Sequence, residues 1–392
     1  MSSNKIRLSL FLCLSMCLGI GILRFSYTAL LPSIREAFGW SASFASILGS
    51  ANLLGYLAGA FWAMKLPQDR SMMCYIQVAA IAGTISLLSC AFSGFSEYWY
   101  MVWRIISGIS GGLLMILSPS VVAQCCELKD RFRINFIGFS GIGLGVLMAT
   151  LFLPYIHDIS TQYAWIILFS FATFICVILS YLLKGFKQYL NAPTLAQQNS
   201  EKISALYYCL LIVYSTSAFA YVPHSLFWID YLTNTLHLFP LGINLNWILY
   251  GTGSALGAFS AYLLAQRLGN IGALKVLYSL YVLGIFVAVL NDSPLFTFMS
   301  SFFTGLLNPA VVFLTSYTIL QIYGTAYKKL WSIATLCFAS IQLLGGLSFS
   351  LLQHYGVSYH QQFIIAATVL LMGTLQLFYF TRKHRHSELK NS

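Results

Sequence analysis

The stretch LSLFLCLSMCLGIGILRFSYTALLPSI, residues 8–34, is an apolar run with one formal charge, Arg24. About 20 apolar residues are enough for a helix to cross the hydrocarbon core of a bilayer. Eleven comparable runs follow, near 41–64, 72–93, 98–123, 134–154, 162–183, 204–222, 245–265, 271–290, 295–319, 330–352 and 359–381. Backbone groups in lipid must bond within their own segment. The sequence therefore predicts an all-α membrane protein with twelve transmembrane helices, the seventh continuing irregularly past Pro223.

The composition supports this prediction. Only 8% of the 392 residues are charged and 58% are apolar, whereas a typical soluble domain is about 25% charged. The net charge of +11 comes from residues near the span ends, where anionic lipid headgroups lie. We therefore expect the lipid bilayer, and no nucleic acid, as the partner of this charge.

The nine cysteines contain no C-x-x-C pair, so no metal site is expected. We expect no other cofactor.

The basic residues also predict the orientation. If the N-terminus is cytoplasmic, 18 of the 21 lysines and arginines lie in the even-numbered turns and the two tails. Cytoplasmic loops of membrane proteins are enriched in these residues. We expect both termini in the cytoplasm and the chain in a bacterial cytoplasmic (inner) membrane.

The longest polar interruption separates two sets of six spans. It predicts an N-terminal six-helix bundle at 1–184, a cytoplasmic linker at 185–203 and a C-terminal six-helix bundle at 204–392. Small residues spaced four apart recur at matching places, in the second span at Ala51, Gly55 and Gly59 and in the eighth at Gly253, Gly257 and Ala261. Such stripes allow close helix packing. Two units with the same starting side form a parallel repeat, as in many transporters. We expect a monomer.

Several motifs resemble those of a known family. The fourth span reads WRIISGISGG (103–112), and the turn after the second reads KLPQDRSMM (65–73) with the pair Asp69-Arg70. These residues resemble motifs of the major facilitator superfamily. GILRFSYTALLPSI, SANLLGYLAGA and GIGLG (141–145) resemble its YbfB/YjiJ-type bacterial subgroup.

The resemblance implies secondary transport through a central cavity lined by helices 1, 4, 7 and 10. It also implies a conformational latch at Asp69, Arg70 and Arg267. In the turn AQRLGN (265–270), Gln266 replaces the usual acid, so the latch is expected to be weaker.

Two charges lie inside spans, Arg24 in the first and Arg104 in the fourth, while all ten acids lie at or beyond span ends. A charge at mid-bilayer costs roughly 2.5–3.5 kcal/mol on insertion scales. Guanidinium groups bind carboxylates and phosphates in bidentate fashion. The pattern favours an anionic ligand for Arg24. The alternatives are snorkelling of Arg24 or bonds to backbone, and for Arg104 a clamp on backbone carbonyls or a part in proton coupling.

Neighbouring polar residues extend the candidate site. Tyr27 lies one turn from Arg24, and Asn52 and Tyr56 lie four apart on the second span; each either contacts the ligand or bonds to an adjacent helix. In AFAYVPHSLFWIDYL (218–232), Tyr221, His224 and Asp230 are candidates for an outer gate, with His224 able to carry a coupling proton. The alternative is an external loop beside an aromatic belt.

We therefore predict a secondary transporter of a small solute, in particular an organic anion, that works by alternating access, with proton coupling left open. The alternatives are an exporter of drug-like or neutral compounds and a non-transporting membrane sensor on the same scaffold. An enzyme is disfavoured because no cluster of catalytic groups is apparent.

Overall fold

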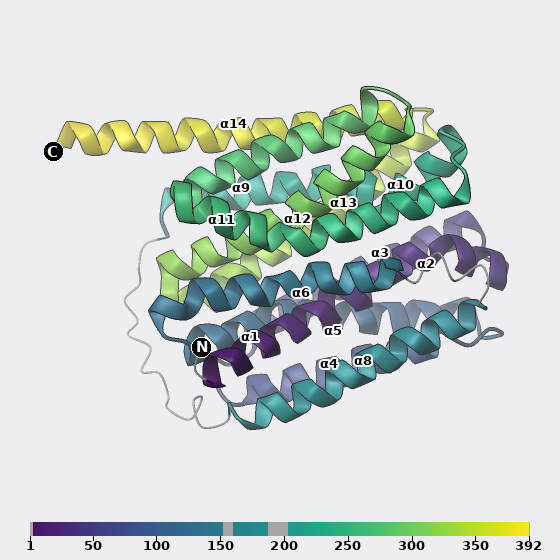
Figure 1. Cartoon of the computed structure of the whole chain (residues 1–392), viewed down its shortest axis with the longest axis horizontal. Helices are drawn as coiled ribbons and strands as arrows, with labels where there is room; N and C mark the ends of the chain where they lie inside the picture. Colours follow the sequence, from purple (N-terminus) through teal and green to yellow (C-terminus); the bar gives the residue numbers. More distant parts are fainter. Residues whose placement is uncertain (1–2, 152–159, 187–202, 392) are drawn as a thin grey trace.

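The computed structural model describes residues 3–151, 160–186 and 203–391, and nearly all of them are helical (Figure 1). The first crossing consists of α1 (Ser3–Met16), the π-helix η1 (Cys17–Ile22) and α2 (Leu23–Phe38), so it is longer than the predicted span 8–34. The other N-terminal elements are α3 (Ala42–Lys65), α4 (Ser71–Ser89), α5 (Glu97–Cys125), η2 (Leu128–Asp130), α6 (Arg131–Leu151) and α8 (Thr161–Lys184). Residues 152–154 of the fifth predicted span lie outside the described residues.

The C-terminal half begins with α9 (Ala205–Ala220), which is followed by the π-helix η3 (Pro223–Phe227), α10 (Trp228–Asp230) and the π-helix η4 (Tyr231–Thr235). The predicted irregular continuation past Pro223 is confirmed by these short segments. The remaining elements are α11 (Pro240–Phe286), η5 (Val287–Val289), α12 (Pro294–Tyr323), η6 (Gly324–Ala326), α13 (Tyr327–His354) and α14 (Tyr359–Asn391).

The described helices make twelve crossings, because two of the long helical stretches are each divided by a turn. In the part of the chain described, ten continuous helical stretches are long and apolar enough to span a membrane, but two of them, Pro240–Val289 and Pro294–His354, each contain two crossings. The chain reverses at Gly269 (φ 69°) and Gly324 (φ 44°), conformations that glycine adopts without a Cβ penalty. The prediction of separate eighth and ninth spans is therefore confirmed.

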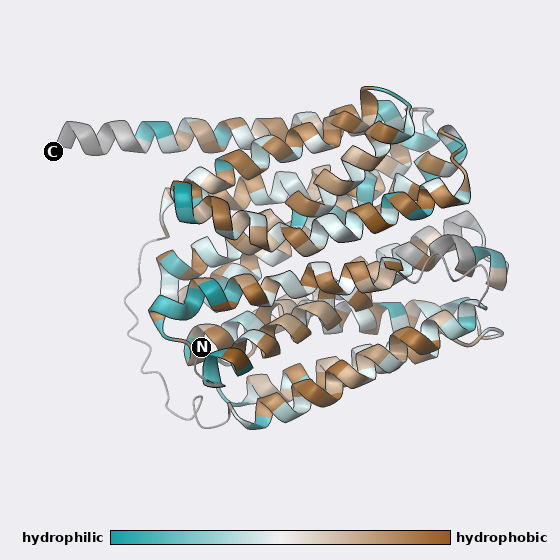
Figure 2. Ribbon diagram, in the orientation of Figure 1, coloured by the Kyte–Doolittle hydropathy of each residue, from teal (hydrophilic) through white to brown (hydrophobic). Residues whose placement is uncertain are grey.

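The outer surface is apolar along the helices. Figure 2 shows hydrophobic residues along their lengths and hydrophilic ones gathered toward the two ends of the molecule. On α8, Phe174, Val177 and Tyr181 are each more than 60% exposed. A soluble monomer rarely exposes so much contiguous apolar surface, so this face suits contact with lipid.

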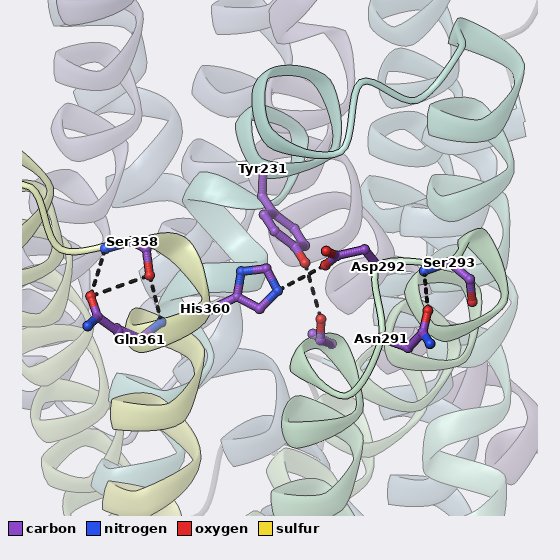
Figure 3. A network of polar contacts seen from close by, with 8 residues as sticks. Tyr231, Asn291, Asp292, Ser293, Ser358, His360 and Gln361 are labelled. Atoms are coloured by element: carbon purple, nitrogen blue, oxygen red, sulfur yellow. Dashed lines mark hydrogen bonds and ion pairs between the residues drawn. The ribbon is translucent and has the colours of Figure 1, made fainter.

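Both chain termini lie at the same end of the molecule, which we call the terminal end (Figure 1). There Lys5 forms an ion pair with Asp130 (2.8 Å). At the opposite end, the side chain of His360 contacts that of Asp292 (2.9 Å), and Tyr231 lies beside them (Figure 3). This contact ties the start of α14 to the loop before α12.

The repeat predicted from small residues is visible in the packing. A Cβ on Gly55 or Gly59 of α3 would lie 2.2 or 2.3 Å from a carbonyl oxygen of α5. A Cβ on Gly253 or Gly257 of α11 would lie 2.3 or 2.4 Å from a carbonyl oxygen of α12. In each half, the same pair of helices therefore packs with its backbones in close contact.

The two bundles meet along two pairs of helices, α6 with α11 and α3 with α13. Gly143 of α6 lies very close to the α11 backbone, because a Cβ there would lie 1.9 Å from the carbonyl oxygen of Ser254. Residues 187–202, most of the expected linker 185–203, lie outside the described residues. The exact domain boundaries therefore stay a prediction.

Candidate functional site

A small cavity lies between the two bundles. Its lining comes from helices of both halves: Ile20, Arg24, Phe25, Tyr56, Met115, Ile142, Tyr214, Tyr221, Asn308, Pro309, Val312 and Phe338. Its volume is about 30 Å³, against the about 10–15 Å³ that one water requires. The bundles are therefore nearly closed around this point. Arg24 is the charged residue among the described residues of the lining.

Arg24 is the second residue of α2 and follows directly on the π-helical turn η1. π-helical turns often occur at functional sites. Its guanidinium donates a hydrogen bond to Oε1 of Gln342 on α13 and lies 5.2 Å from the ring centre of Tyr56 and 5.7 Å from that of Phe25. The side chain is thus turned into the cavity, and the snorkelling alternative does not describe this arrangement.

No acid neutralises Arg24 in the part of the chain that the structure describes. The ion pairs found there are Lys5–Asp130, Lys129–Glu127 and His360–Asp292. The hydrogen-bond acceptor of Arg24 is a neutral amide, and its other close neighbours are aromatic rings. The positive charge therefore remains uncompensated in the centre of the molecule.

Arg104 has a different environment. It is 3% exposed, donates to the carbonyl oxygen of Leu23 (3.2 Å) and lies 4.4 Å from the ring centre of Tyr27. Ser107 donates to the same Leu23 carbonyl (3.0 Å). This geometry matches the alternative of a backbone clamp, and the carbonyl it holds belongs to the residue before Arg24.

The remaining predicted ligand contacts divide into two groups. Tyr56 lines the cavity with Arg24. Tyr27 donates to the carbonyl of Ala45 (2.8 Å), and Asn52 donates to the carbonyl of Arg104 (3.2 Å). Tyr27 and Asn52 thus form the bonds between helices that were the alternative interpretation, and they lie behind the cavity wall.

The predicted gate residues also lie in different environments. Tyr221 lines the cavity, shares a hydrogen bond with Tyr250 and contacts Phe25 of the other bundle edge-on (6.4 Å between ring centres). His224 is buried, and its Nε2 lies 2.8 Å from the hydroxyl of Ser300.

Asp230 lies farther along the same segment. It accepts hydrogen bonds from Asn234 (2.6 Å) and from the hydroxyl of Tyr359. Among these three residues, only Tyr221 reaches the cavity lining.

A cross-bundle contact at the terminal end involves a residue that the motif analysis missed. Lys328, buried at the start of α13, donates to the carbonyl of Leu66 at the end of α3. Asp69 accepts from the backbone N–H of Ser71 (2.8 Å), the first residue of α4. Among the hydrogen bonds and ion pairs of the described residues, none involves the side chain of Arg70 or Arg267.

Two further polar residues at the site, Gln342 beside Arg24 and Asn308 in the cavity lining, are not among the predicted site residues. Gln342 lies in an apolar segment, and a polar residue at membrane depth is the signal that could have revealed it. Pro309 leaves the carbonyl of Gly305, four residues earlier, without its helical donor, and Ser254 donates to that carbonyl (3.2 Å). Asn308 lines the cavity, and its Oδ1 has no partner in the described structure.

Comparison with known proteins agrees with this geometry. Residues 16–377 match a family described as "Uncharacterised MFS-type transporter YbfB". The chain belongs to this family of the major facilitator superfamily. Its fold is similar to that of the proton:xylose symporter XylE bound to 6-bromo-6-deoxy-D-glucose, with a TM-score of 0.73 over 97% of this chain and 96% of that one.

The likeness to XylE, at 16% identity, shows the fold alone. Family and fold together are those of a transporter of small solutes, built of two six-helix bundles, and not of an enzyme. The predicted fold class and family are thereby confirmed.

Proposed function

We propose that this protein is a secondary transporter that moves a small organic anion across the bacterial cytoplasmic membrane by alternating access. The observation that carries the proposal is Arg24, a cation in the cavity between two bundles with no acidic partner among the described residues. A cavity formed by both bundles changes its access when they rock against each other.

The anion supplies the negative charge that the site lacks. An ionised guanidinium in a low-dielectric region is costly unless an opposite charge pairs with it. A carboxylate on the solute fills that role during binding and leaves with the solute after release. We assign direct contact to Arg24 and Tyr56. Arg104, Tyr27 and Asn52 position α2 from behind, through Leu23, Ala45 and the α5 backbone.

Proton coupling and gating form part of the same proposal. The Nδ1 of His224 is buried and has no hydrogen-bond partner in the described structure, so it is our candidate for a coupling proton. Tyr221 and Asp230 lie on the same irregular segment and move with it. At the terminal end, Asp69 and Arg70 lie in the turn after Leu66, the residue that Lys328 contacts, and Arg267 lies near the turn at Gly269; we keep all three as gating candidates.

The basic residues support a cytoplasmic terminal end, and we propose that a monomer is sufficient for transport. The boundaries that we propose for the two bundles are 1–184 and 204–392.

The test combines binding and flux on purified full-length protein. Thermal-shift measurements against small carboxylates, phosphate and neutral compounds are repeated with Arg24→Ala and Arg24→Lys, with the exposed Arg133→Ala as the matched control. We expect one class of anion to raise the melting temperature of the wild type and of Arg133→Ala, and to have no effect on Arg24→Ala. In proteoliposomes the same anion should be transported, and an imposed pH gradient tests the coupling.

Other results would point to the alternative functions. Stabilisation by neutral compounds, unchanged in Arg24→Ala, would indicate an exporter of neutral or drug-like solutes. Arg24-dependent binding without flux would indicate a sensor.

A further inference from the structure

Gln342 is the residue of the C-terminal bundle that accepts a hydrogen bond from Arg24. It lies on α13, is 1% exposed, and accepts a hydrogen bond from Nη2 of Arg24, 318 positions away in sequence. This bond joins the two bundles at the cavity, while the Nε2 of Gln342 lies at the long distance of 3.5 Å from the hydroxyl of Ser225.

The amide oxygen of Gln342 lies where an oxygen of a bound carboxylate would lie. Both are planar acceptors at the end of a short group, but a carboxylate also brings the opposite charge and can accept two parallel hydrogen bonds from the guanidinium. The cavity of about 30 Å³ beside Arg24 is too small for an organic solute in this closed arrangement. An organic anion that pairs with Nη2 of Arg24 takes the place of the amide oxygen of Gln342.

Among the described residues of the lining, Arg24 supplies the one charge, which is enough for one anionic group. Arg104 donates to the carbonyl of Leu23 and does not line the cavity. Apart from Arg24 and Asn308, the lining is apolar or aromatic, with the rings of Phe25, Tyr56, Tyr214, Tyr221 and Phe338. A second ionised group on the solute would lie among these rings without an opposite charge, which is costly.

We propose that the transported anion is a monocarboxylate with an apolar body, and that its carboxylate displaces the amide oxygen of Gln342 from Arg24. This inference rests on the proposed function and adds the class of substrate. The displacement has two consequences. It frees the N–H groups of Gln342 to donate to the second carboxylate oxygen. It also breaks the direct Arg24–Gln342 bond between the bundles, so that solute binding itself releases them to move.

The first test needs no variant. Binding to the purified full-length protein is measured for benzoate and hexanoate and for the matched dicarboxylates phthalate and adipate, at a pH where all carboxyl groups are ionised. Benzamide is the neutral control for benzoate. We expect at least one monocarboxylate to bind at least tenfold more tightly than its dicarboxylate partner, and benzamide to give no shift.

The second test places a permanent carboxylate at the same position. In Gln342→Glu the new carboxylate pairs with Arg24, so we expect a higher melting temperature without ligand and at least a tenfold loss of monocarboxylate affinity. Gln361→Glu, an exposed glutamine at the opposite end (Figure 3), makes the same chemical change away from the cavity and should bind like the wild type.

The outcomes separate the two levels of the proposal. Dicarboxylates or phosphate that bind as tightly as monocarboxylates, in an Arg24-dependent way, would overturn the substrate class and leave anion transport standing. Unchanged monocarboxylate affinity in Gln342→Glu would overturn the displacement. If no anion of any class binds in an Arg24-dependent way, the proposed function itself fails.

Discussion

At the scale of single residues, proline decides where the helix backbone offers free acceptors. A proline inside a helix removes the hydrogen bond to the carbonyl four residues earlier. Pro119 lies inside α5, and the Met115 carbonyl, four positions before it, accepts instead from Nε1 of Trp331 on α13 (3.2 Å). In this way a local break in one bundle becomes a contact with the other.

This pairing leads to our first prediction, a double-mutant cycle. Trp331→Phe leaves the buried Met115 carbonyl without its donor and should lower the free energy of unfolding by about 1–3 kcal/mol. Pro119→Ala restores a backbone N–H within α5, so in that background the cost of Trp331→Phe should fall by about 1 kcal/mol. Unfolding in detergent, followed by intrinsic fluorescence or calorimetry, measures both steps. Equal costs in the two backgrounds would contradict the pairing.

Single residues also show the limit of sequence reasoning. The position of Arg24 within an apolar run predicted a charge at membrane depth, and its location in the cavity agrees with that prediction. Its acceptor could not be predicted, because Gln342 carries no charge and lies 318 residues away. Lys328 was missed for a related reason, since a basic residue near a span end is expected at the cytoplasmic boundary in any case.

At the scale of elements, the apolar runs predicted every crossing, but not the irregularities inside them. Nothing in the sequence CLGIGI marks a π-helix at η1, because the wider turn depends on packing against α6 and α5. Pro223, by contrast, predicted the end of α9 correctly, since proline restricts the backbone wherever it occurs. The turn at Gly269 was predicted through the polar residues around it.

The contact between α6 and α11 gives the second prediction. A Cβ at Gly143 would lie 1.9 Å from the carbonyl oxygen of Ser254. This distance is a severe steric clash between a methyl group and a carbonyl oxygen. Gly143→Ala should therefore keep the two helices apart, so that the closed arrangement is not reached. We expect normal membrane insertion and a fall in the transport rate of at least tenfold, measured in proteoliposomes.

Gly242→Ala is the matched control for this substitution. Gly242 lies in the first turn of α11, where a Cβ would meet its nearest neighbour at 3.7 Å. This variant should transport at the wild-type rate. A wild-type rate in Gly143→Ala would mean that the close contact is not needed in the transport cycle.

At the scale of the whole molecule, fold and charge contribute different parts of the predicted orientation. An even number of crossings brings both termini to one end (Figure 1), and the lysines and arginines gather in the turns and tails of that end. The fold alone does not say which side of the membrane this end faces. The charge predicts that it faces the cytoplasm, because cytoplasmic loops of membrane proteins are enriched in lysine and arginine.

The third prediction tests that orientation. In a background with the nine native cysteines replaced, single cysteines are introduced at Lys329, exposed at the terminal end, and at Tyr355, which is 76% exposed at the opposite end. In intact cells a membrane-impermeant maleimide should label Tyr355→Cys and not Lys329→Cys. Inside-out vesicles should give the reverse pattern, and permeabilised cells, in which both sides are accessible, should show labelling of both. Labelling of Lys329→Cys in intact cells would place the basic loops outside and would contradict the charge argument without changing the fold.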